Sequence, residues 1–163
     1  MPMEIRKNVR GIAHDTDVAR ITLMRVPDRP GIAAAIFQPL AEANVSVDTI
    51  AQSSGADGTT DISFTVSRDS LGRTVELVRA IASHIGAERV DEADDLAKVS
   101  IVGTGMQSAP GYAARMFGTL AGANINIAII STSDIRITCV VPRDRAEDAV
   151  RILHTAFELD RED

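Results

Sequence analysis

The chain has 163 residues, of which 45% are hydrophobic, so it can bury a core in one domain or in two small ones. Aromatic residues make up only 3%, which predicts an aliphatic core, and the formal net charge of −6 disfavours nucleic acid and anionic membranes as partners. The single cysteine, Cys139, cannot form an intrachain disulfide, and residues 1–10 carry alternating charges instead of the apolar segment of a signal peptide. We therefore expect a cytoplasmic protein.

One sequence pattern occurs twice. The segment from Asp28 to Ile50 predicts a tight turn, a helix rich in small residues and an apolar strand, and a similar segment begins at Pro110. Identical residues recur at the spacing of 80 residues that separates Pro30 from Pro110, among them Pro30/Pro110, Gly31/Gly111, Phe37/Phe117, Leu40/Leu120, Ala41/Ala121, Ala43/Ala123 and Asn44/Asn124. A match of this length without a gap indicates a duplicated folding unit.

Strand and helix patterns alternate through the first repeat. Residues 8–14 predict a short strand, residues 15–17 a turn, and residues 19–26 a half-buried strand with Ala19, Ile21 and Leu23 on one face. The next predicted elements are a loop at 27–31, a helix at 31–43, a strand at 45–52, a hairpin loop at 53–58, a strand at 59–67, a helix at 71–85 and a short strand at 88–93. The apolar residues of the first helix recur at helical spacing, at Ile32, Ala35, Ile36 and Leu40.

The second repeat follows the same order but lacks its last strand. Its predicted elements are a strand at 98–102, a loop at 103–109, a helix at 110–123, strands at 125–131 and 135–141, and a helix at 145–157. Because an unpaired sheet edge is unfavourable, we expect the strand at 8–14 to complete the second sheet. The sequence thus predicts an α+β fold of two ferredoxin-like βαββαβ units, at 18–95 and 96–163, with 5–15 adding a strand to the second.

Four motifs make the chain resemble the C-terminal regulatory half of aspartate kinases, which is built from tandem ACT domains. These motifs are Gly11–Asp15, Val26–Ala33, Asp57–Thr65 and Ile130–Ile137. Aspartate kinases start the lysine, threonine and methionine branches from aspartate, and ACT domains sense small molecules. The family's kinase domain, with its Lys-Phe-Gly-Gly stretch, is not found in these residues. The resemblance therefore implies a regulatory subunit or fragment that takes part in feedback inhibition and has no catalytic site of its own.

The turn before the first helix offers groups that suit an amino-acid effector. The free amides of a helix N-terminus attract a carboxylate, and Gly31, Ile32 and Ala33 supply such amides. Asp28 is the natural partner for an ammonium group, and Gln52 can both donate and accept hydrogen bonds. In the second repeat, residues 107–109 replace the acidic part of this turn, so we expect the better site at the first loop.

The resemblance implies that a second unit, from another chain, forms the opposite wall of the site. The full set of expected effector-binding residues is Asp28, Pro30, Gly31, Ile32, Ala33, Gln52, Ala113, Asn124, Asn126 and Ile127. We expect threonine first and lysine second as the effector, with Asp48 or Glu42 available to the lysine ε-ammonium group. We expect no metal and no cofactor in this chain, because ATP would bind only to the separate kinase domain.

The expected partners are a second copy of the chain, through the ACT domains, and a subunit that carries the kinase domain. The alternative function is a stand-alone ACT-repeat protein that senses an amino acid and regulates another enzyme. One site residue, Asn124, has a structural interpretation as well. It and its counterpart in the first repeat, Asn44, end helices, where asparagine readily adopts the left-handed conformation. Cys139, in a predicted strand, is interpreted as a small core residue.

Overall fold

The computed structural model describes residues 9–106 and 111–159. The residues divide into two compact units, one of residues 17–94 and one that combines residues 1–16 with 95–163. We call these the first and the second unit. Each is described by itself below, and statements about them refer to the described residues.

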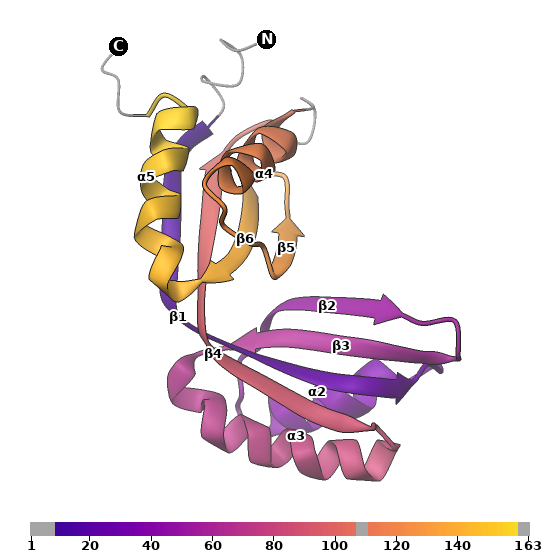
Figure 1. The fold of residues 1–163 in the computed structure, drawn as a ribbon. Helices are drawn as coiled ribbons and strands as arrows, with labels where there is room; N and C mark the ends of the chain where they lie inside the picture. Colours follow the sequence, from indigo (N-terminus) through magenta and orange to yellow (C-terminus); the bar gives the residue numbers. More distant parts are fainter. Residues whose placement is uncertain (1–8, 107–110, 160–163) are drawn as a thin grey trace. The chain divides into compact units, whose positions relative to one another are not determined.

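The first unit has the βαββαβ order that the sequence predicts. Its elements are the C-terminal part of β1 (Val9–Pro27), α2 (Ile32–Glu42), β2 (Asp48–Ser54), β3 (Thr59–Val66), the 3-10 helix η1 (Arg68–Ser70), α3 (Leu71–Ile85) and the start of β4 (Arg89–Gly103). The strand order is β2-β3-β1-β4, and β3 pairs antiparallel with both β1 and β2 (Figure 1). This is a ferredoxin-like sheet with both helices formed as predicted.

The second unit repeats this architecture with a strand taken from the beginning of the chain. Its elements are the rest of β4, α4 (Tyr112–Gly122), β5 (Ile129–Thr132), β6 (Arg136–Pro142), the 3-10 helix η3 (Arg143–Arg145) and α5 (Ala146–Ala156), and the N-terminal part of β1 joins them. The strand order is β1-β4-β6-β5. Val9, only 2% exposed, belongs to the core of this unit. The prediction that an N-terminal strand completes the second sheet is confirmed.

Two predicted breaks between strands are wrong. Residues 15–17 do not form a turn, because β1 continues through them, and residues 89–103 form one strand, β4, where the sequence predicted two. The carboxylate of Asp17 does accept a hydrogen bond from a backbone amide. The donor, however, is Arg68, 2.9 Å away and far along the chain, and not a residue of a local turn. Pairing between the neighbouring strands β1 and β4 holds both segments extended and overrides the turn preference of the acidic residues.

Each unit buries its own aliphatic core between its helices and its sheet. In the first unit Ile32, Ile36 and Leu40 of α2 are buried as predicted, whereas Ala35 is exposed, so its assignment to the apolar face is wrong. In the second unit Cys139 is fully buried, and its thiol lies 3.9 Å from the sulfur of Met116. Burial raises the pKa of this thiol to about 12, as befits a core residue.

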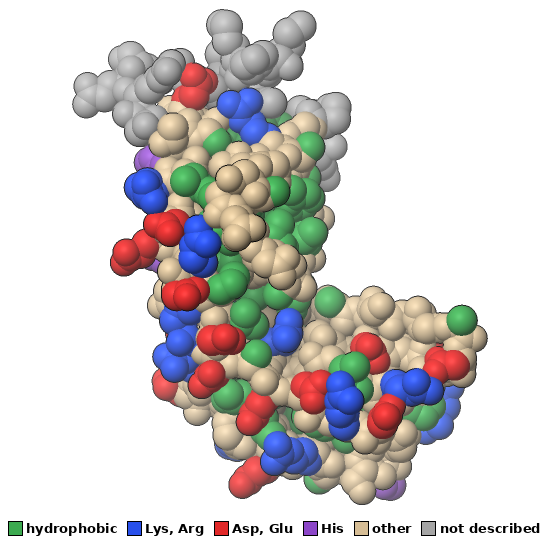
Figure 2. Space-filling model, in the orientation of Figure 1, with side chains coloured by type: hydrophobic (Ala, Val, Ile, Leu, Met, Phe, Trp, Pro, Cys, Tyr) green, Lys and Arg blue, Asp and Glu red, His purple; other side chains and the backbone are tan. Residues whose placement is uncertain are grey.

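On the side drawn in Figure 2, acidic and basic side chains are interspersed, and hydrophobic side chains lie among them. Among the described residues, no helix has both the length and the apolar character needed to cross a membrane.

Candidate effector-binding site

The loop between β1 and α2 ends in a glycine that starts the helix. Gly31, the N-cap residue, has φ 90°, a left-handed conformation that glycine adopts without steric cost, and its carbonyl accepts the Ala35 amide at 3.0 Å. The amide of Ile32 donates to the Arg29 carbonyl at 3.2 Å. Of the three amides predicted to meet a carboxylate, that of Ile32 is therefore already engaged. Pro30, Gly31 and Ala33 lie on the exposed surface, whereas the Ile32 side chain is buried.

Asp28 presents an uncommitted carboxylate beside this helix terminus. Its backbone amide donates to the carbonyl of Gly58 at 3.0 Å, which ties the loop to the turn between β2 and β3. Its side chain is exposed and makes no hydrogen bond or ion pair with any described residue. The backbone of Asp28 is therefore fixed while its carboxylate is accessible, an arrangement that suits the binding of an ammonium group.

The other polar residues assigned to the first unit lie on or near its edge strand. Gln52 is exposed on β2 and pairs with Ile62 of β3. Asp48, at the start of β2, accepts the amide of Thr49 at 2.8 Å. Glu42 ends α2, and a rise of about 1.5 Å per residue puts it roughly 15 Å from the first turn of that helix. Glu42 is therefore too far from the helix N-terminus to bind the ε-ammonium of a lysine held there by the same unit.

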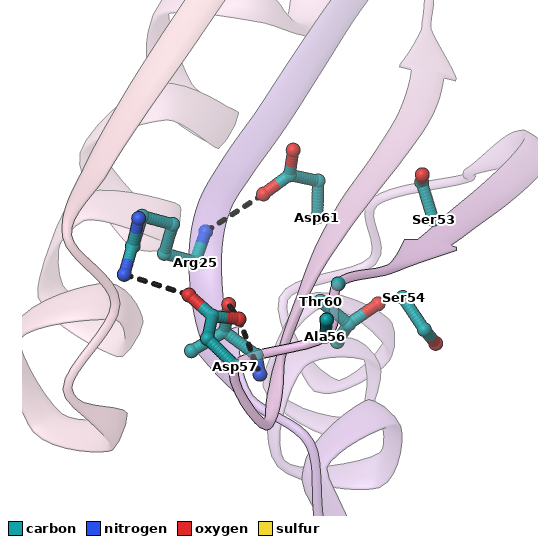
Figure 3. A pocket seen from close by; sticks show the side chains of 9 residues that line it. Arg25, Ser53, Ser54, Ala56, Asp57, Thr60 and Asp61 are labelled. Carbon is teal, nitrogen blue, oxygen red and sulfur yellow. Dashed lines mark hydrogen bonds and ion pairs between the residues drawn. The ribbon is translucent and has the colours of Figure 1, made fainter.

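A hollow of about 400 Å³ lies beside the turn between β2 and β3 in the first unit, lined by Arg25, Ser53, Ser54, Gly55, Ala56, Asp57, Thr59, Thr60 and Asp61. Figure 3 shows the Arg25 guanidinium directed at Asp57 and the Arg25 amide directed at Asp61. The amide donates to Asp61 Oδ1 at 2.8 Å, and the guanidinium lies 2.7 Å from Asp57 Oδ2 and 3.0 Å from Glu88 Oε2. A single arginine thus binds three acidic residues from separate parts of the unit.

Asp57 is itself held by the residue two positions later. Its Oδ1 accepts the Thr59 hydroxyl at 2.6 Å and the Thr59 amide at 3.1 Å. These hydrogen bonds, with the nearby Arg25 charge, keep the pKa of the Asp57 carboxyl below its usual value. Asp57 is therefore charged at neutral pH and fixes the turn that receives the Asp28 amide.

The four site residues predicted on the second unit lie on and after α4. Ala113 and Ile127 are half-buried and pack against the core, whereas Asn124 and Asn126 are exposed. Asn126 was predicted inside a strand at 125–131, which is wrong: β5 begins at Ile129, and Asn126 lies in the irregular segment before it. The Asn126 side chain is solvent-exposed, so it needs no buried partner and is open to a ligand. The residues 107–110 of the second loop lie outside the described residues.

Each unit exposes one large aliphatic side chain on its outermost strand. Ile50 on β2 is 56% exposed and Ile130 on β5 is 50% exposed, and they are separated by the 80-residue spacing of the repeat. An exposed edge strand that carries an aliphatic side chain is a surface for pairing with another chain.

Sequence reasoning missed Arg25 and Asp61. The signal available in the sequence was a comparison of the repeats, because the residue 80 positions after Arg25 is Gly105. The structure shows that both residues have a left-handed backbone, with φ 53° and 69°. Where one repeat has a glycine and the other an arginine, the arginine can be in a backbone conformation that only glycine adopts freely, and neighbouring contacts must then stabilise it.

Two comparisons relate the chain to known proteins. ACT domain family models match residues 20–83 and 99–157. The chain is 47% identical over 152 residues to an aspartate kinase from Stutzerimonas stutzeri, an alignment that covers 93% of this chain and 37% of that protein. The chain therefore spans a little more than a third of the length of this relative.

Two solved structures match over almost their whole length. The regulatory subunit of aspartate kinase from Thermus thermophilus, in a ligand-free form, has 41% identity and a TM-score of 0.88, with 93% of this chain and 99% of that chain covered. A chain from the structure of aspartokinase alpha and beta subunits has 45% identity and a TM-score of 0.86, with coverage of 92% and 99%.

Proposed function

Because the chain belongs to the family of ACT-domain regulatory subunits of aspartate kinase, we propose that it binds a free end-product amino acid and controls a separate subunit that carries the kinase domain. The observation that carries this proposal is the uncommitted carboxylate of Asp28 next to the first turn of α2. An α-amino acid bears an ammonium and a carboxylate on one carbon. The carboxylate would bind the open amides of the helix terminus, and the ammonium would bind Asp28.

Threonine is the effector that these residues favour, and lysine is the second candidate. Threonine adds a single hydroxyl, which the exposed Gln52 can meet with its donor or its acceptor. Lysine adds a second ammonium group that needs another acid, and the position of Glu42 at the far end of α2 leaves Asp48 as the candidate in this unit. Only the threonine side chain can be satisfied without an additional charged partner.

The site would be completed by the second unit of another copy of the chain. Asn124 and Asn126 are both exposed and carry side chains that can donate and accept. The exposed Ile50 and Ile130 on equivalent edge strands support a homodimer in which the first unit of one protomer associates with the second unit of its partner. Two equivalent sites would then form in each dimer.

Regulation would follow from differential binding. An effector that binds one arrangement of the dimer more tightly shifts the holoenzyme toward it, and the kinase subunit responds with lower activity. ATP and aspartate would bind only to that subunit, so this chain would need no cofactor. Support for the two-chain arrangement comes from the 99% coverage of the Thermus thermophilus regulatory subunit, a separate chain of similar extent.

Isothermal titration of the chain with L-threonine and with L-lysine tests the proposal. We expect binding of threonine, and we expect Asp28→Asn to weaken it by about 10- to 100-fold, as for a lost charge-assisted hydrogen bond. Asp69→Asn, at an exposed acid of η1, is the matched control and should bind as the unmodified chain does. Absence of heat with both amino acids would refute effector binding.

Mixing the chain with an aspartate kinase catalytic subunit separates the proposed function from the alternative. Co-purification and amino-acid-sensitive kinase activity are expected for a regulatory subunit. A chain that binds the amino acid but neither associates with that subunit nor changes its activity would be a stand-alone sensor for another enzyme.

A further inference from the structure

Strand β1 carries one extra residue just before the Asp28 loop. Leu23 pairs with Ile62 of β3, but Val26 pairs with Thr60, so the register shifts by one residue between them. Side chains of a regular strand alternate between faces with a period of two, yet Leu23 and Val26, three residues apart, are both fully buried in the core. A β-bulge between them reconciles the two observations.

Arg25 occupies the strained position of this bulge. Its φ of 53° is left-handed, a conformation that is unfavourable for a residue with a side chain. In the second repeat the corresponding residue is Gly105, with φ 69°, for which the conformation is permitted. The residues that follow, Val26 and Met106, are both core residues of their units. A left-handed residue thus recurs one position before a core residue, as an arginine inside β1 of the first unit and as a glycine just after the end of β4 in the second.

Asp61 supplies the stabilising contact for Arg25. Its Oδ1 accepts the Arg25 amide at 2.8 Å, a hydrogen bond strengthened by the charge of the carboxylate. The ion pairs of the guanidinium with Asp57 and Glu88 join side chains that are 44–57% exposed, where water screens the attraction. The contact to Asp61 is the one made by the Arg25 backbone itself, so it constrains the bulge directly, whereas the ion pairs act through the arginine side chain.

The bulge determines how the following residues are presented. After it, Val26 pairs with Thr60, Pro27 pairs with Thr59, and the amide of Asp28 donates to the Gly58 carbonyl. Loss of the extra residue's conformation would shift this ladder by one position, turn Val26 away from the core and move Asp28 off its anchor. The direction of the Asp28 carboxylate therefore depends on a conformation three residues earlier.

We propose that Asp61 is a positioning residue for the effector site: by holding the Arg25 amide in the bulge, it fixes the register of β1 and so aims Asp28 at the ligand. The part of this inference that concerns the ligand rests on the proposed function. The part that concerns the backbone does not.

The test combines two readouts on the full chain. The first is the exchange rate of the Asp28 amide hydrogen, measured by NMR, and the second is calorimetric titration with L-threonine and L-lysine. We expect Asp61→Ala to speed exchange by about tenfold and to weaken binding by about tenfold, because the bulge loses its acceptor. Asp61→Asn keeps an acceptor oxygen and should stay close to the unmodified chain.

Arg25→Gly in the Asp61→Ala background is the decisive variant, because it gives the first repeat the residue that the second repeat has at Gly105. Glycine adopts the bulge conformation unaided, so slow exchange and tight binding should return. A residue that touched the ligand directly would not be rescued in this way. Thermal unfolding, recorded in parallel, separates any loss of overall stability from loss of the local register.

The matched control is Asp17→Ala, which removes a carboxylate that accepts another backbone amide, that of Arg68, at 2.9 Å. It should leave Asp28 exchange unchanged. Unchanged exchange in Asp61→Ala, or no rescue by Arg25→Gly, would overturn the inference. If exchange responds as expected but the unmodified chain gives no heat with either amino acid, the positioning role stands and the proposed effector function fails.

Discussion

Asn44 and Asn124 have the same left-handed backbone, with φ 60° and 59°, and donate their amides to equivalent carbonyls, those of Ala41 and Ala121, at 3.0 and 2.9 Å. The next residue in each repeat donates to the carbonyl of a leucine in the last turn, at 2.9 Å in both. The sequence duplication is therefore also a duplication of the hydrogen bonds that end α2 and α4. Asparagine at these two positions has a structural role, whether or not one of them also binds the effector.

Replacement of Asn124 by glycine separates these two roles. Glycine accepts the left-handed conformation, so Asn124→Gly should unfold at the same urea concentration as the unmodified chain or a slightly higher one. The variant lacks the carboxamide, so we expect its affinity for threonine in calorimetry to fall by about tenfold.

Asn44→Gly is the matched control, since it makes the same change in the first repeat at a residue outside the proposed site. It should keep both stability and affinity. Equal affinity in the two variants would show that Asn124 only ends a helix.

Shortening the equivalent buried leucine in each unit should destabilise the core of that unit alone. Leu40 and Leu120 are 1% and 0% exposed and belong to different core clusters. Leu40→Ala and Leu120→Ala should each lower the free energy of unfolding of their own unit by about 2–5 kcal/mol. Amide exchange should accelerate mainly in the unit that carries the substitution, and equal acceleration in both units by either variant would show that the cores unfold together.

The exposed isoleucines on the edge strands test the proposed dimer. Ile50→Lys or Ile130→Lys places a charge on β2 or β5, which disfavours pairing with another chain, and should raise the dimer dissociation constant more than about tenfold in analytical ultracentrifugation. Ile135, also exposed at 52%, lies in the turn before β6, and Ile135→Lys serves as the control. A monomeric unmodified chain, or equal effects of all three changes, would contradict the assigned interface.

The turn between β2 and β3 should depend on the charge of Asp57. Because hydrogen bonds from Thr59 lower the pKa of Asp57 in the folded chain, its contribution to stability is present above the unfolded-state pKa, about 4, and is lost as pH falls through the folded-state value. Asp57→Asn should therefore be less stable than the unmodified chain at neutral pH, and the difference should disappear in acid.

Urea denaturation from about pH 7 to about pH 3 measures this difference. Asp69→Asn, at an exposed acid of η1, is the matched control. A gap between Asp57→Asn and the unmodified chain that stayed constant with pH would show that the carboxylate charge is not responsible.

Most helices and the assignment of strands to repeats could be predicted from periodicity alone. The helix at 71–85 has the predicted bounds. Pro30 and Pro110, 80 residues apart, marked in the sequence the positions just after which α2 and α4 begin. The predictions failed where a segment's conformation depends on a neighbour in space. The turn at 15–17 and the position of Asn126 are of this kind, because strand pairing extends through the first and begins only after the second.

The candidate site was predicted in part for the same reason. Asp28 and Gly31 were identified because turn and helix-start chemistry is local to a few residues. Arg25 was not, since its importance lies in a contact to Asp61, which lies 36 residues away along the chain. The engaged amide of Ile32 and the remote location of Glu42 likewise became visible only once the loop and helix were built.

The sequence by itself determined that two copies of one βαββαβ unit are present, because hydrophobic period and turn residues act over short distances and repeat with constant spacing. Only the tertiary structure decided that the strand completing the second sheet and the first strand of the first unit are one continuous β1, that a bulge shifts its register before Asp28, and which acid holds that bulge. These features depend on hydrogen bonds between strands that are far apart in the chain, and such pairing leaves no periodic signal in either strand alone.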